Sequence, residues 1–196
     1  MTEVAHPGIE AVIITGASSG IGSATAETLA EQGKALILLA RRKAPLEAMM
    51  TQLRQQHPQG TFIAVAGDLA HRQECDAVIS GLRHTLHSHS FRLEGFIHCA
   101  GTGTPTDDLQ HWKPDDLEAA LALNVMAPLR LIQALLPYLA DNTQAHAHFC
   151  RIVLVGAGID RQAQPGTGTY GISKMALRRL FEQLILEIGR ASCRER

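Results

Sequence analysis

Tyr170 and Lys174 lie four residues apart in the sequence. On a helix, side chains with this spacing share one face. An ammonium beside a phenol favours the phenolate, so we expect Lys174 to lower the pKa of Tyr170. A tyrosine with a lowered pKa can give or take a proton near neutral pH. The spacing alone can be a coincidence, and it indicates acid–base chemistry only when other features support it.

The segment Thr15-Gly-Ala-Ser-Ser-Gly-Ile-Gly22 could bind an anion. It follows the apolar run 12–14 and precedes residues 23–32, which have the pattern of a helix. The first amide groups of a helix lack partners within the helix, and the helix dipole adds positive potential there. Glycines let the backbone turn sharply and approach a phosphate closely. The alternative is a tight strand-to-helix turn that binds no ligand.

Apolar runs typical of buried strands alternate with segments of helical periodicity. We expect strands at 9–15, 36–40, 62–66, 95–99 and 152–155, and helices at 23–32, 46–57, 74–86, 114–139 and 170–187. This alternation predicts an α/β fold of βαβ units, with a parallel sheet covered by helices on both faces. Ligands of such sheets bind beyond the C-terminal strand ends. Those ends carry the glycine-rich turn, Arg41, Asp68, Ala100, Gly101 and the segment after Val155.

Length and composition limit the classes of protein that fit. The 196 residues suffice for one domain with a sizeable core. A net charge of -1 gives no electrostatic argument for nucleic acid or an anionic membrane, and no apolar run approaches the ~20 residues of a membrane span. Residues 1–10 lack the features of a secretory signal. Four cysteines without C-x-x-C spacing favour free thiols and a cytoplasmic location.

The ten histidines raise the question of a metal site. They include two clusters, His84, His87 and His89, and His146 and His148 near Cys150. Neither cluster has carboxylates at ligand spacing. We therefore expect solvated surface histidines and no metal.

Five motifs together resemble those of the short-chain dehydrogenase/reductase family. They are the Thr15–Gly22 segment, Asp68-Leu69, Cys99-Ala100-Gly101, Asn124-Val125 and Tyr170-Gly-Ile-Ser-Lys174. Their order and separations fit the family from about residue 11 to residue 187. The resemblance implies a three-layer, Rossmann-type, doubly wound parallel sheet with strand order 3-2-1-4-5. It places residues 1–187 in one domain that binds a nicotinamide dinucleotide.

The resemblance also implies a role for each matching residue. The phosphates and adenosine ribose of the cofactor would contact Thr15, Gly16, Ser18, Gly20, Ile21 and Gly22. Asp68 and Leu69 would contact the adenine, and Ala100 and Gly101 would line the ribose and nicotinamide side. Tyr170 would be the acid or base, and Lys174 would hold the nicotinamide ribose. Asn124 would anchor a water that relays protons to Lys174.

The activity implied by the resemblance is hydride transfer between the nicotinamide and a carbonyl or secondary alcohol. The substrate would be a small molecule. The resemblance also implies a homodimer or homotetramer packed through the helices at 114–139 and 170–187.

Charge at the end of the second strand favours NADP(H) over NAD(H). An acid at this position would bind a ribose 2′-hydroxyl and repel a 2′-phosphate. The position is Ala40, and Arg41 follows it. Arginine suits a phosphate because it forms planar, charge-assisted hydrogen bonds. The alternative is that Arg41 and Arg42 only begin a solvated helix.

Two sites depart from the family pattern. Pro165-Gly166 align without a gap, which places Ala157 at the position of the family's catalytic serine. Losing such a donor can cost about a hundredfold to a thousandfold in rate, unless Thr167, Thr169 or a water replaces it. The alternatives to an active enzyme are therefore a weak or inactive dinucleotide-binding protein and an inert fragment. His98 and Cys99 replace two asparagines that are common in the family, and we expect effects on packing.

The end of the sequence also departs from the family. Family members usually continue with a sixth and a seventh strand, whereas residues 188–196 show no family resemblance. These nine residues can be encoded by ATCGGAAGAGCGTCGTGTAGGGAAAGA, which reads like a short-read sequencing adapter. We expect a non-native tail, a sheet without the sixth and seventh strands, and an exposed edge at the fifth strand.

Overall fold

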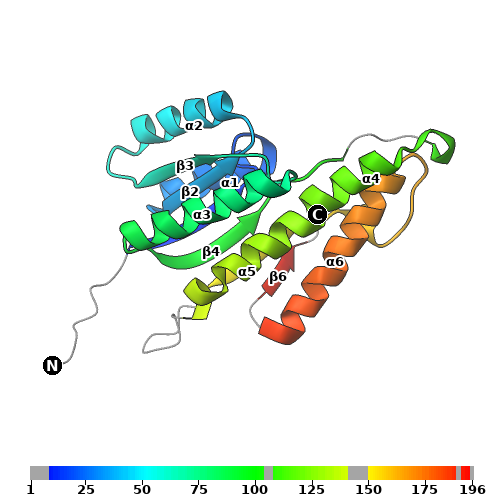
Figure 1. Ribbon diagram of the computed structural model, residues 1–196. Coiled ribbons are helices and arrows are strands. Elements are labelled where there is room, and N and C mark those ends of the chain that lie inside the picture. Colours follow the sequence, from blue (N-terminus) through cyan, green and yellow to red (C-terminus); the bar gives the residue numbers. More distant parts are fainter. Residues whose placement is uncertain (1–8, 104–107, 141–149, 189–190, 195–196) are drawn as a thin grey trace.

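A parallel sheet of six strands, in the order β3-β2-β1-β4-β5-β6, forms the centre of the molecule (Figure 1). The computed structural model describes residues 9–103, 108–140, 150–188 and 191–194. The strands are β1 (Glu10–Thr15), β2 (Ala35–Ala40), β3 (Phe62–Ala66), β4 (Arg92–His98), β5 (Arg151–Val155) and β6 (Ala191–Arg194). The main helices are α1 (Gly20–Glu31), α2 (Lys43–Gln56), α3 (Arg72–Ser88), α4 (Pro114–Leu121), α5 (Ala127–Ala140) and α6 (Gly168–Ile188). The predicted order of the first five strands is confirmed.

Helices cover both faces of the sheet because side chains alternate along each buried strand. Ile13 of β1 belongs to the core under α3, α5 and α6, whereas Val12 and Ile14 belong to the core under α1 and α2. Figure 1 shows these two groups of helices on opposite sides of the strands. All six residues of β2 are buried, as expected for a strand covered twice. The predicted three-layer arrangement is therefore confirmed.

The expected absence of a sixth strand is wrong for this structure. Residues 191–194 pair in parallel with β5, from Ile152 opposite Ala191 to Val155 opposite Arg194. An unpaired strand edge offers its backbone groups to any extended segment, and that pairing requires no particular side chains. The fifth strand is consequently not an edge. That residues 188–196 form a non-native tail stays a prediction.

The helix expected at 114–139 is interrupted by a π-helical turn, η2 (Ala122–Met126), between α4 and α5. The N–H of Ala127 donates to the carbonyl of Ala122, one residue further back than in an α-helix. The irregularity thus lies just before Pro128, which has no N–H to donate. By length and composition the segment Pro114–Tyr138 could cross a membrane. Part of this apolar segment packs in the core, where Leu131 is fully buried.

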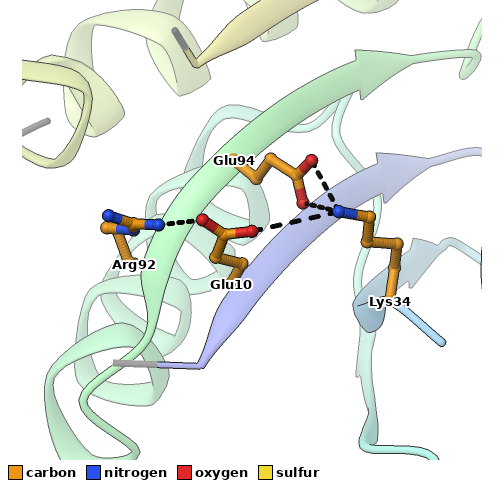
Figure 2. A network of polar contacts seen from close by, with 4 residues as sticks. All are labelled: Glu10, Lys34, Arg92 and Glu94. Atoms are coloured by element: carbon orange, nitrogen blue, oxygen red, sulfur yellow. Dashed lines mark hydrogen bonds and ion pairs between the residues drawn. The ribbon is translucent and has the colours of Figure 1, made fainter. Parts of the chain in front are cut away.

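A network of charged side chains joins the amino ends of neighbouring strands (Figure 2). Lys34 Nζ lies 2.8 and 2.7 Å from the two carboxylate oxygens of Glu94, and 3.9 Å from Glu10 Oε2. Arg92 pairs with the other oxygen of Glu10. The network therefore ties β1, β4 and the residue before β2 at the end of the sheet opposite the candidate site.

Candidate functional site

The glycine-rich turn after β1 leaves no room for side chains where it meets β4. Gly16 has φ +65°, and a Cβ on it would lie 2.7 Å from the backbone nitrogen of Ala100. A Cβ on Gly22 would collide with the carbonyl of Gly16. Gly20, the first residue of α1, has φ +57°, and the preceding Ser19 forms no side-chain cap. The turn therefore presents backbone amides at a helix N-terminus, as an anion site requires.

A cavity of about 450 Å³ opens at the C-terminal strand ends beside this turn. Ten of the residues predicted to bind the cofactor line it, namely Gly16, Ser18, Gly20, Ile21, Gly22, Arg41, Asp68, Leu69, Ala100 and Gly101. The cavity also has lining residues that we had not predicted as cofactor contacts, including Cys99, Thr102 and Leu123. Cys99 and Thr102 adjoin Ala100-Gly101 in the sequence, and Leu123 precedes Asn124. Closeness to a motif was therefore the signal by which the sequence could have identified these lining residues. The convergence of these segments at one sheet edge agrees with the fold rule.

Thr15 lies beneath the cavity and does not line it. Its side chain is fully buried, and its Oγ1 accepts the N–H of Ala100 at 3.1 Å. The same oxygen lies 2.8 Å from His98 Nδ1. Thr15 thus supports the position of Ala100 from below, which differs from the expected contact with a cofactor.

Arg41 and Asp68, which both line the cavity, form an ion pair. Arg41 Nη1 lies 3.6 Å from Asp68 Oδ2, and the Arg41 side chain is 71% exposed. The other carboxylate oxygen, Oδ1, accepts the N–H of Ala70 at 2.9 Å. An exposed pair of this length contributes little to stability, so Arg41 can exchange Asp68 for another anion at low cost.

The structure brings Asn124 and Lys174 close to Gly101, which lines the cavity, although Asn124, Lys174 and Tyr170 are not themselves among its lining residues. A Cβ on Gly101 would lie 3.1 Å from Asn124 Oδ1 and 3.5 Å from Lys174 Nζ. Asn124 is fully buried in the π turn, where its Oδ1 accepts the N–H of Thr102 at 3.0 Å. Its Nδ2 donates to the Thr102 carbonyl at 3.1 Å and to Ser173 Oγ at 2.8 Å. Asn124 therefore fixes the backbone that follows Gly101.

Tyr170 and Lys174 share one face of α6, as predicted. Lys174 Nζ lies 5.7 Å from the centre of the Tyr170 ring and donates to the Val155 carbonyl at 2.8 Å. Burial raises the pKa of Tyr170 above its ordinary value, the direction opposite to our expectation. The ammonium is directed to Val155 and not to the phenol, so desolvation of the phenolate prevails.

The structure offers no obvious replacement for the serine hydroxyl missing at Ala157. The carbonyl of Ala157 accepts the N–H of Asp160 at 3.0 Å, in the short helix η4 (Gly158–Asp160). The hydroxyl of Thr167 donates to the carbonyl of Gln164 at 2.7 Å. Thr169 is buried. Neither threonine therefore presents a free hydroxyl to the cavity in the way a catalytic serine would.

Within the described residues, no group of three or more metal-ligating side chains could hold a metal ion. His146 and His148, from the second predicted cluster, lie outside those residues. His98 stands apart from the exposed histidines because its side chain is buried at the end of β4. Periodicity placed it in a strand and gave no further signal.

Known proteins share both the sequence pattern and the fold. The family model described as short chain dehydrogenase matches residues 10–194. An uncharacterized oxidoreductase of Listeria monocytogenes is 31% identical over 176 residues, which are 90% of this chain and 66% of that protein. The sulfoacetaldehyde reductase of Chromohalobacter salexigens is 30% identical, over 84% of this chain and 61% of its own length.

A solved structure with a similar fold is a bulky-bulky ketone specific alcohol dehydrogenase from Comamonas testosteroni. It has a TM-score of 0.80 and 26% identity, with 94% of this chain and 72% of that chain covered. L-sorbose reductase from Gluconobacter frateurii, solved with NADPH and L-sorbose, has a TM-score of 0.81 and 25% identity, with 92% and 65% covered. The chain spans about two thirds or less of the length of the curated relatives named above. It belongs to the short-chain dehydrogenase family.

Proposed function

We propose that this chain is the cofactor-binding and catalytic part of an NADP(H)-dependent oxidoreductase that acts on a small carbonyl compound or secondary alcohol. One observation carries the proposal. A single cavity runs from the glycine-rich turn to Gly101, where Asn124 and Lys174 approach within a few ångströms of a Cβ built on that glycine. The groups proposed for phosphate binding thus line the cavity, and Asn124 and Lys174, proposed for proton transfer, lie beside its wall at Gly101.

The residues at the first end fit a dinucleotide. The backbone at Gly16 and Gly22 has no space for a Cβ, and the first turn of α1 has no side-chain cap from Ser19. These residues would hold the phosphates. Arg41 would hold a ribose 2′-phosphate, and its weak pairing with Asp68 keeps the guanidinium at the mouth of the cavity. A similar dehydrogenase from Shigella flexneri, 26% identical with a TM-score of 0.79, was solved with NADP.

The residues at the second end would move a proton. The nicotinamide, when bound, would supply or accept the hydride. Tyr170 would donate its phenolic proton to the substrate oxygen during reduction, and its raised pKa keeps the phenol protonated at neutral pH. Lys174 would hold the ribose hydroxyls, and Asn124 would hold the Thr102 backbone and the proton-relay water. Sulfoacetaldehyde reductase and L-sorbose reductase, both similar to this chain, support a carbonyl substrate.

The second candidate is a protein that binds the dinucleotide with little or no turnover. Ala157 favours it, because neither Thr167 nor Thr169 presents a free hydroxyl in place of the missing serine. The presence of Asn124, Tyr170 and Lys174 in one constellation opposes it. Assembly as a homodimer or homotetramer and a cytoplasmic location are part of the leading proposal.

Cofactor titration tests the proposal first. NADPH should bind the chain more tightly than NADH, as measured by quenching or enhancement of nicotinamide fluorescence. Arg41→Ala should weaken NADPH binding by about tenfold and leave NADH binding nearly unchanged, because one charge-assisted contact is lost. Lys43→Ala is the matched control, because Lys43 is an exposed neighbouring cation that pairs with Glu47. If the original protein and Arg41→Ala each bind NADPH and NADH with equal affinity, the preference for NADP(H) is refuted.

Turnover separates the two candidates. A panel of aldehydes and ketones is mixed with NADPH, and loss of its absorbance is followed with the original protein and with Tyr170→Phe. Turnover that Tyr170→Phe abolishes supports the oxidoreductase. Binding of NADPH without turnover of any substrate moves the second candidate ahead. An absence of binding refutes both.

A further inference from the structure

The carbonyl of Leu123 lacks a donor from its own helix. In an α-helix the N–H of Ala127 would reach it, but here that N–H donates to Ala122. In the π-helical pattern the next donor would be residue 128, which is a proline without an N–H. Within the described chain, the helix therefore leaves this carbonyl to be satisfied from outside.

His98, the last residue of β4, has a buried ring nitrogen that needs a hydrogen-bond partner. The side chain is 1% exposed, and its Nε2 has no hydrogen-bond partner within the described residues. The backbone of Leu123 nevertheless interacts with the imidazole and raises its pKa. Burial, followed by the charge of Lys174, has the larger and opposite effect and lowers the pKa to about 3. The ring is thus neutral at physiological pH and carries one N–H.

The hydrogen bonds of Thr15 determine which nitrogen carries that proton. Thr15 Oγ1 accepts the N–H of Ala100, so its own hydrogen is free to point toward its other partner. That partner is His98 Nδ1, 2.8 Å away, which then acts as the acceptor. With Nδ1 as the acceptor, the single proton of the neutral ring lies on Nε2. The Nε2–H of His98 and the carbonyl of Leu123 would each destabilise the fold if buried without a hydrogen-bond partner. A hydrogen bond between them removes both penalties.

We infer that His98 is a positioning residue whose Nε2–H donates to the carbonyl of Leu123 and thereby links the glycine-rich turn to the π turn. One end of the link is the contact of Thr15 with Ala100, and the other end is the residue before Asn124. His98 therefore does more than fill space, which corrects our expectation of packing alone.

The tautomer is the first test, and it needs neither cofactor nor activity. The original protein is labelled with ¹⁵N-histidine, and long-range ¹H–¹⁵N spectra are recorded between pH 5 and pH 8. The spectrum of His98→Asn identifies the signals that belong to His98. A neutral ring with its proton on Nε2 throughout this range is expected. A proton on Nδ1, or a ring that gains charge in this range, would overturn the inference.

A double-mutant cycle with Pro128 tests the link to Leu123. His98→Asn keeps an acceptor for Thr15 and removes the donor for Leu123, so the melting temperature should fall by at least about 3 °C. Pro128→Ala restores an N–H to the helix and lets the turn satisfy its own carbonyls. In that background His98→Asn should cost less than half as much. Equal losses in both backgrounds would overturn the link.

Two further variants separate positioning from general damage. His98→Gln places an amide donor near the position of Nε2 and should retain more stability than His98→Asn. His84→Asn is the control, because His84 is exposed on α3, and it should leave the melting temperature unchanged. If His98→Asn fails to fold, the spectrum of His98→Gln identifies the His98 signals, and the tautomer in the original protein still decides.

The consequence for the site rests on the proposed function. His98→Asn should weaken NADPH binding several-fold, because the link holds Ala100 and the turn that carries Asn124, and Pro128→Ala should restore part of that loss. An unchanged affinity would overturn the role in the site. If the original protein does not bind NADPH, the proposed function fails, whereas the tautomer and the double-mutant cycle still test the link itself.

Discussion

Replacing Asn124 by alanine should destabilise the protein and weaken its cofactor site. The side chain is fully buried and makes three hydrogen bonds, at 3.0 and 3.1 Å to the backbone of Thr102 and at 2.8 Å to Ser173 Oγ. Ser173 keeps a partner without it, because its hydroxyl donates to the carbonyl of Tyr170 at 2.8 Å. The two backbone groups of Thr102 lose the partner that Asn124 supplies.

The magnitude follows from those two groups. Each buried polar group left unpaired costs about 1–3 kcal/mol, and Thr102 is only half-buried, so water can recover part of the loss. We expect a net loss of about 3 kcal/mol in the free energy of unfolding. For a chain of this size the melting temperature should fall by about 6–12 °C. NADPH affinity should fall as well, because Thr102 follows Gly101 in the wall of the cavity.

Thermal unfolding followed by circular dichroism, with a parallel fluorescence titration of NADPH, measures both effects. Gln133→Ala on α5 is the control, because Gln133 is exposed and its loss should stay within about 0.5 kcal/mol. A fall of less than about 2 °C for Asn124→Ala would show that Thr102 does not depend on Asn124, and the reasoning would be refuted.

Three other perturbations test other parts of the structure. Lys34→Ala leaves Glu94 without its cation and should reduce the free energy of unfolding by about 1 kcal/mol in urea at low salt, with a smaller loss at high salt because the pair is partly exposed. An equal loss at both salt concentrations would contradict this. The pKa of His98 is lowered from 6.5 to about 3, so its contribution to stability is complete above about pH 6.5 and is lost as the pH falls toward 3. Urea unfolding at several pH values should show a shallower decline for His98→Gln, and identical slopes would refute the assignment. Ala157→Ser should raise the rate of carbonyl reduction by at least about tenfold, measured as kcat, if the absent hydroxyl limits turnover. No gain would rule that limit out.

Much of the architecture was predictable because local patterns encode it. The buried runs of β1 and β2, with helical periodicity between them, are sufficient to predict βαβ units and a parallel sheet. The rule that ligands bind at C-terminal strand ends then placed Arg41, Asp68 and Gly101 around one cavity, where the structure has them. The sixth strand was not predictable in this way, because four residues that pair by backbone alone carry no pattern of their own.

The details of the site depend on contacts between distant segments. The π turn at Asn124 ends two residues before Pro128, whereas the periodicity of the sequence predicted one continuous helix there. The raised pKa of Tyr170 depends on burial, whereas the spacing to Lys174 suggested the opposite direction. The pairing of Arg41 with Asp68 joins the ends of two strands that are adjacent only in the folded sheet.

The sequence by itself determined the family, the order of the first five strands and the location of the cavity at the C-terminal strand ends, because these follow from periodicity and from motifs whose residues are close in the chain. Only the tertiary structure decided how His98 is used. It brings Thr15 to His98 across 83 residues of sequence and buries the ring beside a helix that lacks one N–H. The physical reason is desolvation, because a polar atom must find a partner only when folding removes it from water.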